Sequence, residues 1–201
     1  MRKQLAENDS LYQGIEVDNG KRYIKEGIIL PETECQEGYE IGLLGTMALM
    51  FGFQLGLPAL WNTENGRSGI GQWGLMDQGS GNYNGLIPAE PSAWSKVFLG
   101  WETPIDTLQG NGLKVACSKT KEPYKIYKIP INDHECFLIE NRIHDPDGDG
   151  VTLGWDSSGN EITFQPDGTL SPKPEGVIIR VKEYDYGLPG SGILIWHVDN
   201  Q

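Results

Sequence analysis

The pattern of apolar and polar positions in the first third of the chain predicts a hairpin followed by one apolar helix. Residues 11–30 alternate in the manner of strands, and residues 18–20, Asp-Asn-Gly, are typical of a hairpin turn. Residues 39–57 are the main helix candidate, which Gly56 and Pro58 should end. The first third therefore predicts both strands and helix.

After this helix the pattern predicts loop, a short helix and then strands. Residues 62–90 are rich in Gly and Asn and should be mostly loop, whereas residues 91–99 predict a short helix with Pro91 in its first turn. Residues 144–174 are polar, with Asp-Gly and Pro turns, and indicate an inserted loop region or ribbon. Strands are predicted at 113–118, 124–130, 135–142, 176–182 and 192–198.

The main helix candidate lies within a stretch that has no charged side chain. Residues 41–60 are long enough to span a bilayer, so a membrane-anchored chain is one interpretation. Several glycines, Gln54 and Pro58 oppose it, and no basic flank orients the segment. A helix that is apolar on all sides can equally be buried. We expect a core helix here, with Phe51 and Leu55 packed inside.

Composition narrows the range of partners. The net charge of −12 argues against nucleic acid, which requires clustered Lys and Arg, and it disfavours anionic membrane surfaces. An acidic chain is soluble and attracts cations such as calcium. Among the three cysteines, Cys117 and Cys136 lie in neighbouring predicted strands and could pair, or both could be buried free thiols. Residues 1–9 contain no apolar signal-peptide core.

A run of alternating aspartates predicts a calcium-binding loop at residues 145–156. Asp at positions 1, 3 and 5 with Gly at position 6 is the spacing of EF-hand loops, in which position 7 offers a backbone carbonyl and position 12 a carboxylate. The other interpretation is an acidic surface turn. The candidate ligands are Asp145, Asp147, Asp149, Val151 and Asp156.

Several ordered segments resemble the immune inhibitor A family of secreted bacterial zinc metallopeptidases. The first is residues 49–56, Leu-Met-Phe-Gly-Phe-Gln-Leu-Gly, which has the frame of the family's His-Glu-x-x-His-x-x-Gly helix. The other segments are Gly69–Asp77, which resembles the family's Met-turn, Ser92–Lys96, Leu99–Trp101, Phe137–Arg142 and Tyr184–Asp199. The resemblance implies an α+β fold, with a zincin-like helical core in residues 1–110 and a β-rich region in residues 111–201.

Placed on the family's motif, this chain lacks the catalytic side chains. The two His positions are Leu49 and Phe53, the Glu position is Met50, the Gly is kept as Gly56, and Ala59 stands where an acidic residue often follows. The Met-turn methionine is Met76, for which we expect a packing role. A zinc site needs two imidazoles one helical turn apart. Without the metal, the pKa of a water molecule stays far above the value of about 7 that bound zinc gives it. Zinc is therefore not expected.

The remaining polar residues supply no second site. The spacing of His134, His144 and His197 gives no two-histidine helical site, and we expect a structural role for His197. Glu64 and Asp77 are the acids nearest the helix motif, and we interpret them as solvated loop residues.

These observations predict a catalytically inactive metallopeptidase-like domain that acts as a binding, structural or regulatory module. The alternatives are a zinc-dependent endopeptidase of the immune inhibitor A type and a chain anchored in the membrane through residues 41–60. The partner would be a peptide or protein, and the resemblance implies an extracellular or cell-surface location.

Overall fold

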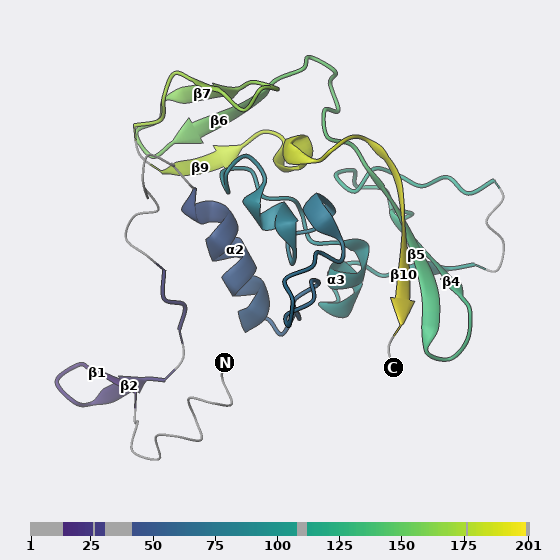
Figure 1. Cartoon of the computed structure of the whole chain (residues 1–201), viewed down its shortest axis with the longest axis horizontal. Coiled ribbons are helices and arrows are strands. Elements are labelled where there is room, and N and C mark those ends of the chain that lie inside the picture. The colour runs from purple at the N-terminus through teal and green to yellow at the C-terminus, as the bar shows by residue number, and fades with distance from the viewer. Residues whose placement is uncertain (1–13, 26, 31–41, 108–111, 176, 200–201) are drawn as a thin grey trace. The chain divides into compact units, whose positions relative to one another are not determined.

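A computed structural model describes residues 14–25, 27–30, 42–107, 112–175 and 177–199 (Figure 1). The chain divides into two compact units, Met1–Pro31 and Glu32–Gln201.

The first unit contains the predicted hairpin. Strand β1 (Ile15–Val17) pairs antiparallel with β2 (Arg22–Ile24). Asp18 and Asn19 adopt left-handed backbone angles, with φ of 54° and 55°, and Asp and Asn tolerate this region better than most side chains. The hairpin prediction is confirmed, although residues 11–13 lie outside the described part of the chain.

Helix α2 opens the described part of the second unit. It spans Leu43–Gln54, within the predicted 39–57, and it ends where Gly56 takes a left-handed φ of 95°. Its buried residues are Gly45 and Gly52. A Cβ on Gly45 would lie 1.8 Å from the carbonyl oxygen of Ser80, so the glycine lets the helix approach this neighbouring turn closely.

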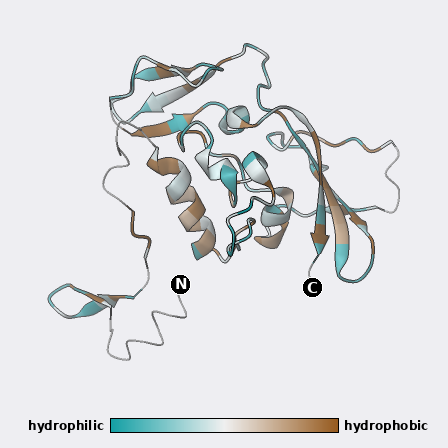
Figure 2. Ribbon diagram, in the orientation of Figure 1, coloured by the Kyte–Doolittle hydropathy of each residue, from teal (hydrophilic) through white to brown (hydrophobic). Residues whose placement is uncertain are grey.

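The expectation of a core helix was wrong for the exposed side of α2. Phe51 is 55% exposed and Leu55 39% exposed, and Met47 and Met50 lie on the same exposed side. Figure 2 shows apolar positions along α2. The pattern failed because an uncharged helix does not mark its solvent side: Gly45 and Gly52 are its buried residues, and Leu49 and Phe53 are only half-buried. No helix among the described residues is long and apolar enough to cross a membrane.

Short helical turns and one further α-helix follow. They are η1 (Gly71–Trp73), η2 (Gln78–Gly81) and α3 (Ala93–Phe98). Helix α3 matches the predicted 91–99 helix, and the Ser92 side chain caps it by accepting a hydrogen bond of 3.3 Å from the backbone N–H of Ser95.

The first four-stranded sheet has the order β10-β5-β4-β3. Its strands are β3 (Ile105–Asp106), β4 (Ile126–Pro130), β5 (Glu135–Arg142) and β10 (Gly192–Asp199). Residues of β5 alternate between a buried face, which includes Cys136 and Leu138, and a more exposed face. The predictions for 124–130, 135–142 and 192–198 are confirmed. Residues 113–118 form no strand but contribute one isolated bridge, Cys117 to Asn141.

A second four-stranded sheet has the order β8-β7-β6-β9. Its strands are β6 (Thr152–Asp156), β7 (Glu161–Phe164), β8 (Leu170–Ser171) and β9 (Ile178–Val181), and η3 (Tyr184–Gly187) follows β9. Three of these strands lie in residues 144–174, for which we expected loop or ribbon. The apolar side of this sheet packs on Ile87 and Tyr186, which gives short, Gly-interrupted strands a core.

The predicted zincin-like helical core is wrong. The described chain is rich in β-structure, with two α-helices of 12 and 6 residues and two four-stranded sheets. The buried apolar residues form three separate clusters, one of them against the second sheet. The cluster around Met76 is the one to which α2 contributes. Helices thus supply a minor part of the architecture.

Candidate functional site

The strongest candidate site among the described residues is the acidic loop between β5 and β6. One carboxylate oxygen from each of Asp145, Asp147 and Asp149 lies within 4.8 Å of the others. Asp147 and Asp149 are exposed, and Asp145 is half-buried. Alternating residues of a tight loop thus place three carboxylates around one point, as the sequence predicted for these three residues.

Glycines and hydrogen bonds to Asp145 hold the loop in this shape. The backbone N–H groups of Gly148 and Gly150 donate to the Asp145 carboxylate at 2.9 and 3.0 Å. Both glycines take left-handed φ angles, of 72° and 76°, which other residues adopt only with strain. The hydroxyl of Tyr186 donates to the carbonyl oxygen of Gly150 at 2.5 Å and ties the loop to η3.

A lysine ammonium group already neutralises part of this charge. Lys182 Nζ, at the end of β9, forms an ion pair with Asp147 and lies 3.8 Å from Asp149 Oδ2. The hydrogen bond with Lys182 lowers the pKa of Asp147 below its usual value, and the same bond raises the pKa of Lys182. The loop therefore attracts positive charge in the folded chain.

The predicted ligands Val151 and Asp156 are engaged differently. The backbone N–H of Val151 donates to Asp149 at 3.0 Å. Asp156 is fully buried and accepts hydrogen bonds from Asn160 and from the backbone N–H groups of Ser158 and Glu175. Burial raises the pKa of Asp156, but these hydrogen bonds lower it further, so the net shift is downward. Asp156 is not part of the three-carboxylate group and instead holds the β6–β7 turn.

A glutamate that the sequence did not single out lies next to Lys182. Glu183 is buried, and its Oε2 has no hydrogen-bond partner among the described residues. Burial raises the pKa of its carboxyl group, and the negative charge of Asp147 adds to the rise. This side chain adds a titratable group to the surroundings of the loop.

The positions of the zinc-protease motif carry no metal-binding group. Leu49 and Phe53 are half-buried against Met76, which is fully buried and has the packing role expected of it. Met50 is exposed, and Ala59 is half-buried. Among the described residues, the acidic loop is the only set of three His, Cys, Asp or Glu side chains whose ligand atoms converge. Leu49, Phe53 and Met76 therefore form part of a small apolar cluster, whereas Met50 and Ala59 do not.

Asp77 was interpreted as a solvated loop residue, and this was wrong. It is buried, and its Oδ2 accepts hydrogen bonds of 2.7–2.8 Å from the Ser68 hydroxyl and the backbone N–H groups of residues 69–71. Burial raises its pKa, but the four donors lower it further, and the pKa stays below its usual value. One carboxylate oxygen thus organises the loop before η1, a structural role.

A buried ion network joins the first sheet to η3. Arg142, on β5, donates to both oxygens of Asp185 at 2.7 and 2.5 Å, and both side chains are buried. Burial lowers the pKa of Arg142, but the hydrogen bonds to Asp185 and the negative charges of Asp185, Glu140 and Glu90 together raise it above its usual value. Burial raises the pKa of Asp185, but Arg142 holds it below its usual value. The pair is therefore ionised.

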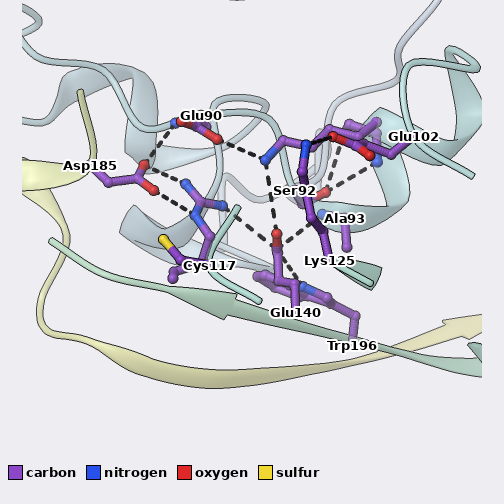
Figure 3. Close-up of polar contacts among 12 residues, drawn as sticks. Glu90, Ser92, Ala93, Glu102, Cys117, Lys125, Glu140, Asp185 and Trp196 are labelled. Carbon is purple, nitrogen blue, oxygen red and sulfur yellow. Dashed lines mark hydrogen bonds and ion pairs between the residues drawn. The ribbon is translucent and has the colours of Figure 1, made fainter. Parts of the chain in front are cut away.

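Glu140 extends this network to α3 and β10. Its Oε1 accepts hydrogen bonds from the backbone N–H of Ala93 at 3.0 Å and from Trp196 Nε1 at 2.9 Å, and it lies 3.6 Å from Arg142 Nη1 (Figure 3). Lys96 Nζ lies 4.0 Å from Glu140 Oε2. The side chains around Glu140 leave no space for a water molecule. The contacts of Glu140 and Arg142 thus connect β5 to α3, β10 and η3.

Of the three histidines that the sequence singled out, His144 directly precedes the acidic loop, and its ring centroid lies 6.0 Å from that of Tyr186. His197 is exposed on β10, with Nε2 3.0 Å from Glu135 Oε2. Cys117 and Cys136 are free thiols, and Cys35 lies outside the described residues.

No known protein family, curated protein or solved structure matches this chain. The residues and their geometry are therefore the basis for assigning a function.

Proposed function

We propose that this chain is a non-catalytic structural and binding module whose acidic loop takes up a calcium ion. The observation that carries the proposal is the convergence of Asp145, Asp147 and Asp149 within 4.8 Å. Calcium takes six to eight oxygen ligands at about 2.3–2.6 Å in flexible geometry. Three carboxylates, each able to bind through one or two oxygens, supply part of that set, and the exposure of the loop lets water supply the rest.

Lys182 competes with calcium for Asp147 and thereby limits the calcium affinity of the loop. Its ammonium must leave Asp147 before a divalent ion can bind there, because both occupy the same carboxylate. The lysine side chain is 39% exposed and flexible, and exposed ion pairs are weak, so displacement is feasible. Competition with Lys182 and the separation of Asp156 from the group favour an affinity in the range of about 10⁻⁴–10⁻³ M, typical of extracellular modules.

The non-catalytic part of the proposal rests on residue chemistry. Leu49 and Phe53 have no lone pair to offer a metal, and the charged side chains around Glu140 lie in a space that excludes water. On the ordered sequence segments alone, we propose a relationship to the immune inhibitor A family, without its zincin-like fold. An extracellular or cell-surface location follows from the same proposal and suits a weak calcium site.

Thermal unfolding of the full chain with calcium, with magnesium and with a chelator tests the calcium site. Calcium at a hundredfold excess over its dissociation constant should stabilise the folded chain by about 2.7 kcal/mol. Asp147→Asn should remove this response. Lys182→Met should strengthen calcium binding several-fold because it removes the competing ammonium. Magnesium should have a smaller effect because it requires a stricter octahedral geometry.

Asp133→Asn is the matched control, since it removes one exposed carboxylate from a turn outside the loop. This variant should keep the full calcium response. A melting curve that responds to neither calcium nor chelator would leave the loop as an acidic turn. Stoichiometric zinc together with cleavage of unfolded casein would instead show that the chain is an endopeptidase.

A further inference from the structure

A groove runs along the C-terminal half of β10, away from the acidic loop. It has a volume of about 280 Å³ and lies between residues 196–199 on one wall and Pro58, Leu60 and Ile70 on the other, with Trp94 among the lining side chains. Side chains of a strand alternate between its two faces. Because four consecutive residues line the groove, the backbone edge of β10 itself faces it.

That edge of β10 has no neighbouring strand among the described residues. β10 is the end strand of its sheet and pairs with β5 alone, in an unbroken register from Gly192 to Asp199. It contains no proline, lysine or bulge, the usual features that prevent an edge strand from pairing with another chain. Ile193 and Ile195 are 53% and 63% exposed on its outer face. Such an edge can pair with an extended strand.

The charge at this end of the sheet indicates what would pair there. Asp199 lies opposite Glu135 in the strand register, and exposed Asp133 lies in the adjoining turn. No lysine or arginine is among the residues that line the groove. The chain as a whole carries a net charge of −12. A second copy would bring like charges together, whereas a basic segment would meet opposite charge.

We infer that this groove and edge bind an extended, basic peptide segment of a partner protein. The peptide adds a strand to β10 through main-chain hydrogen bonds, and one apolar or aromatic side chain enters the groove. The volume is smaller than that of most cofactor pockets but accommodates a large side chain. Lysine or arginine residues flank that side chain and face the acids. This inference does not depend on calcium binding at the acidic loop.

Selection of a phage-displayed random heptapeptide library on the full chain tests the inference. We expect enrichment of peptides in which an apolar or aromatic residue is flanked by lysine or arginine. The enriched peptide, made synthetically and labelled with fluorescein, should protect amides of residues 196–199 from hydrogen exchange. An absence of enrichment, a preference for acidic peptides, or protection confined to other segments would overturn the inference.

Exposed Pro58, on the groove rim, provides a matched pair of variants. Pro58→Lys should weaken binding of the labelled peptide at least tenfold, whereas Pro58→Glu should leave it within threefold or tighten it. Equal binding by the two variants would contradict the role of charge. Sedimentation that shows β10-dependent dimers at micromolar concentration without peptide would assign the edge to a second copy instead.

Discussion

Removing the charge of Asp185 tests whether the buried ion network holds η3 against the first sheet. Asp185→Asn keeps the size and shape of the side chain but leaves the buried guanidinium of Arg142 without its main counter-charge. In the native chain that guanidinium donates two hydrogen bonds, of 2.7 and 2.5 Å, to Asp185. Both residues are fully buried, so water cannot replace the lost partner.

The structure indicates that Asp185→Asn should lower the free energy of unfolding by an amount at the lower end of the range for broken buried ion pairs. Breaking a buried ion pair by removing one partner costs about 3–5 kcal/mol. Glu140 Oε1 remains 3.6 Å from Arg142 Nη1, so the guanidinium keeps part of its compensation. We therefore expect a loss of about 3 kcal/mol. For a chain of this length that corresponds to a fall in Tm of about 6–12 °C.

Urea unfolding followed by tryptophan fluorescence measures this loss, and the chain has six Trp to report it. The double variant Arg142→Met/Asp185→Asn should lose less than the sum of the two single variants, because the unpaired charge is gone. Arg142 lowers the pKa of Asp185 in the folded chain despite its burial. The stabilisation is therefore complete above the unfolded-state pKa of about 3.9 and is lost as the pH falls through the folded-state pKa.

Two results would refute this reasoning. One is an Asp185→Asn variant within about 1 kcal/mol of the native chain at pH 7, well short of the cost of a broken buried pair. The other is a double variant whose loss equals the sum of the single losses, since residues in direct contact should be coupled.

Three further outcomes follow from the packing. Asp77→Asn should cost about 1–3 kcal/mol in urea unfolding, because an amide matches fewer of the four donors around it, and a neutral result would contradict that role. Gly52→Ala should lower the free energy of unfolding by about 1–3 kcal/mol, because the new Cβ would lie 2.5 Å from the flexible Met76 side chain. Gly45→Ala should lower it more, because its Cβ would meet rigid backbone. A larger loss for Gly52→Ala than for Gly45→Ala would show that α2 packs differently. Leu55→Asp should leave a folded protein whose free energy of unfolding is within about 1 kcal/mol of that of the native chain, since Leu55 is 39% exposed. Insoluble protein would show that Leu55 is part of the core.

Local patterns predicted most of the elements but not their arrangement. A strand-like pattern predicted β5, and Asp-Asn-Gly predicted the first hairpin, because each depends on neighbouring residues alone. Helix α2 was predicted as an element, but its buried face was not. An uncharged helix carries no polar side to mark solvent. Only tertiary contacts bury Gly45 against the backbone of Ser80 and Gly52 against the Met76 side chain.

The buried network left a signal in the sequence that pattern analysis can detect. Glu140 and Arg142 lie in phase with Cys136 and Leu138 on the buried face of β5, so a charged pair on that face was predictable from the alternation. The partner Asp185 was not predictable, because it lies 43 residues away and reaches Arg142 only through the fold. Asp77 is similar, since three backbone N–H groups that carry no sequence signature surround it.

By itself the sequence determined the three clustered aspartates, because a tight loop with glycine at its bends brings alternating residues together wherever it lies. It also determined the absence of zinc ligands at positions 49, 50 and 53, which is a matter of side-chain chemistry. Tertiary structure alone decided that Lys182 pairs with the loop, that Asp156 accepts hydrogen bonds in the β6–β7 turn, and that the edge strand β10 borders a groove. These features depend on contacts between residues distant in the chain, which no local periodicity encodes.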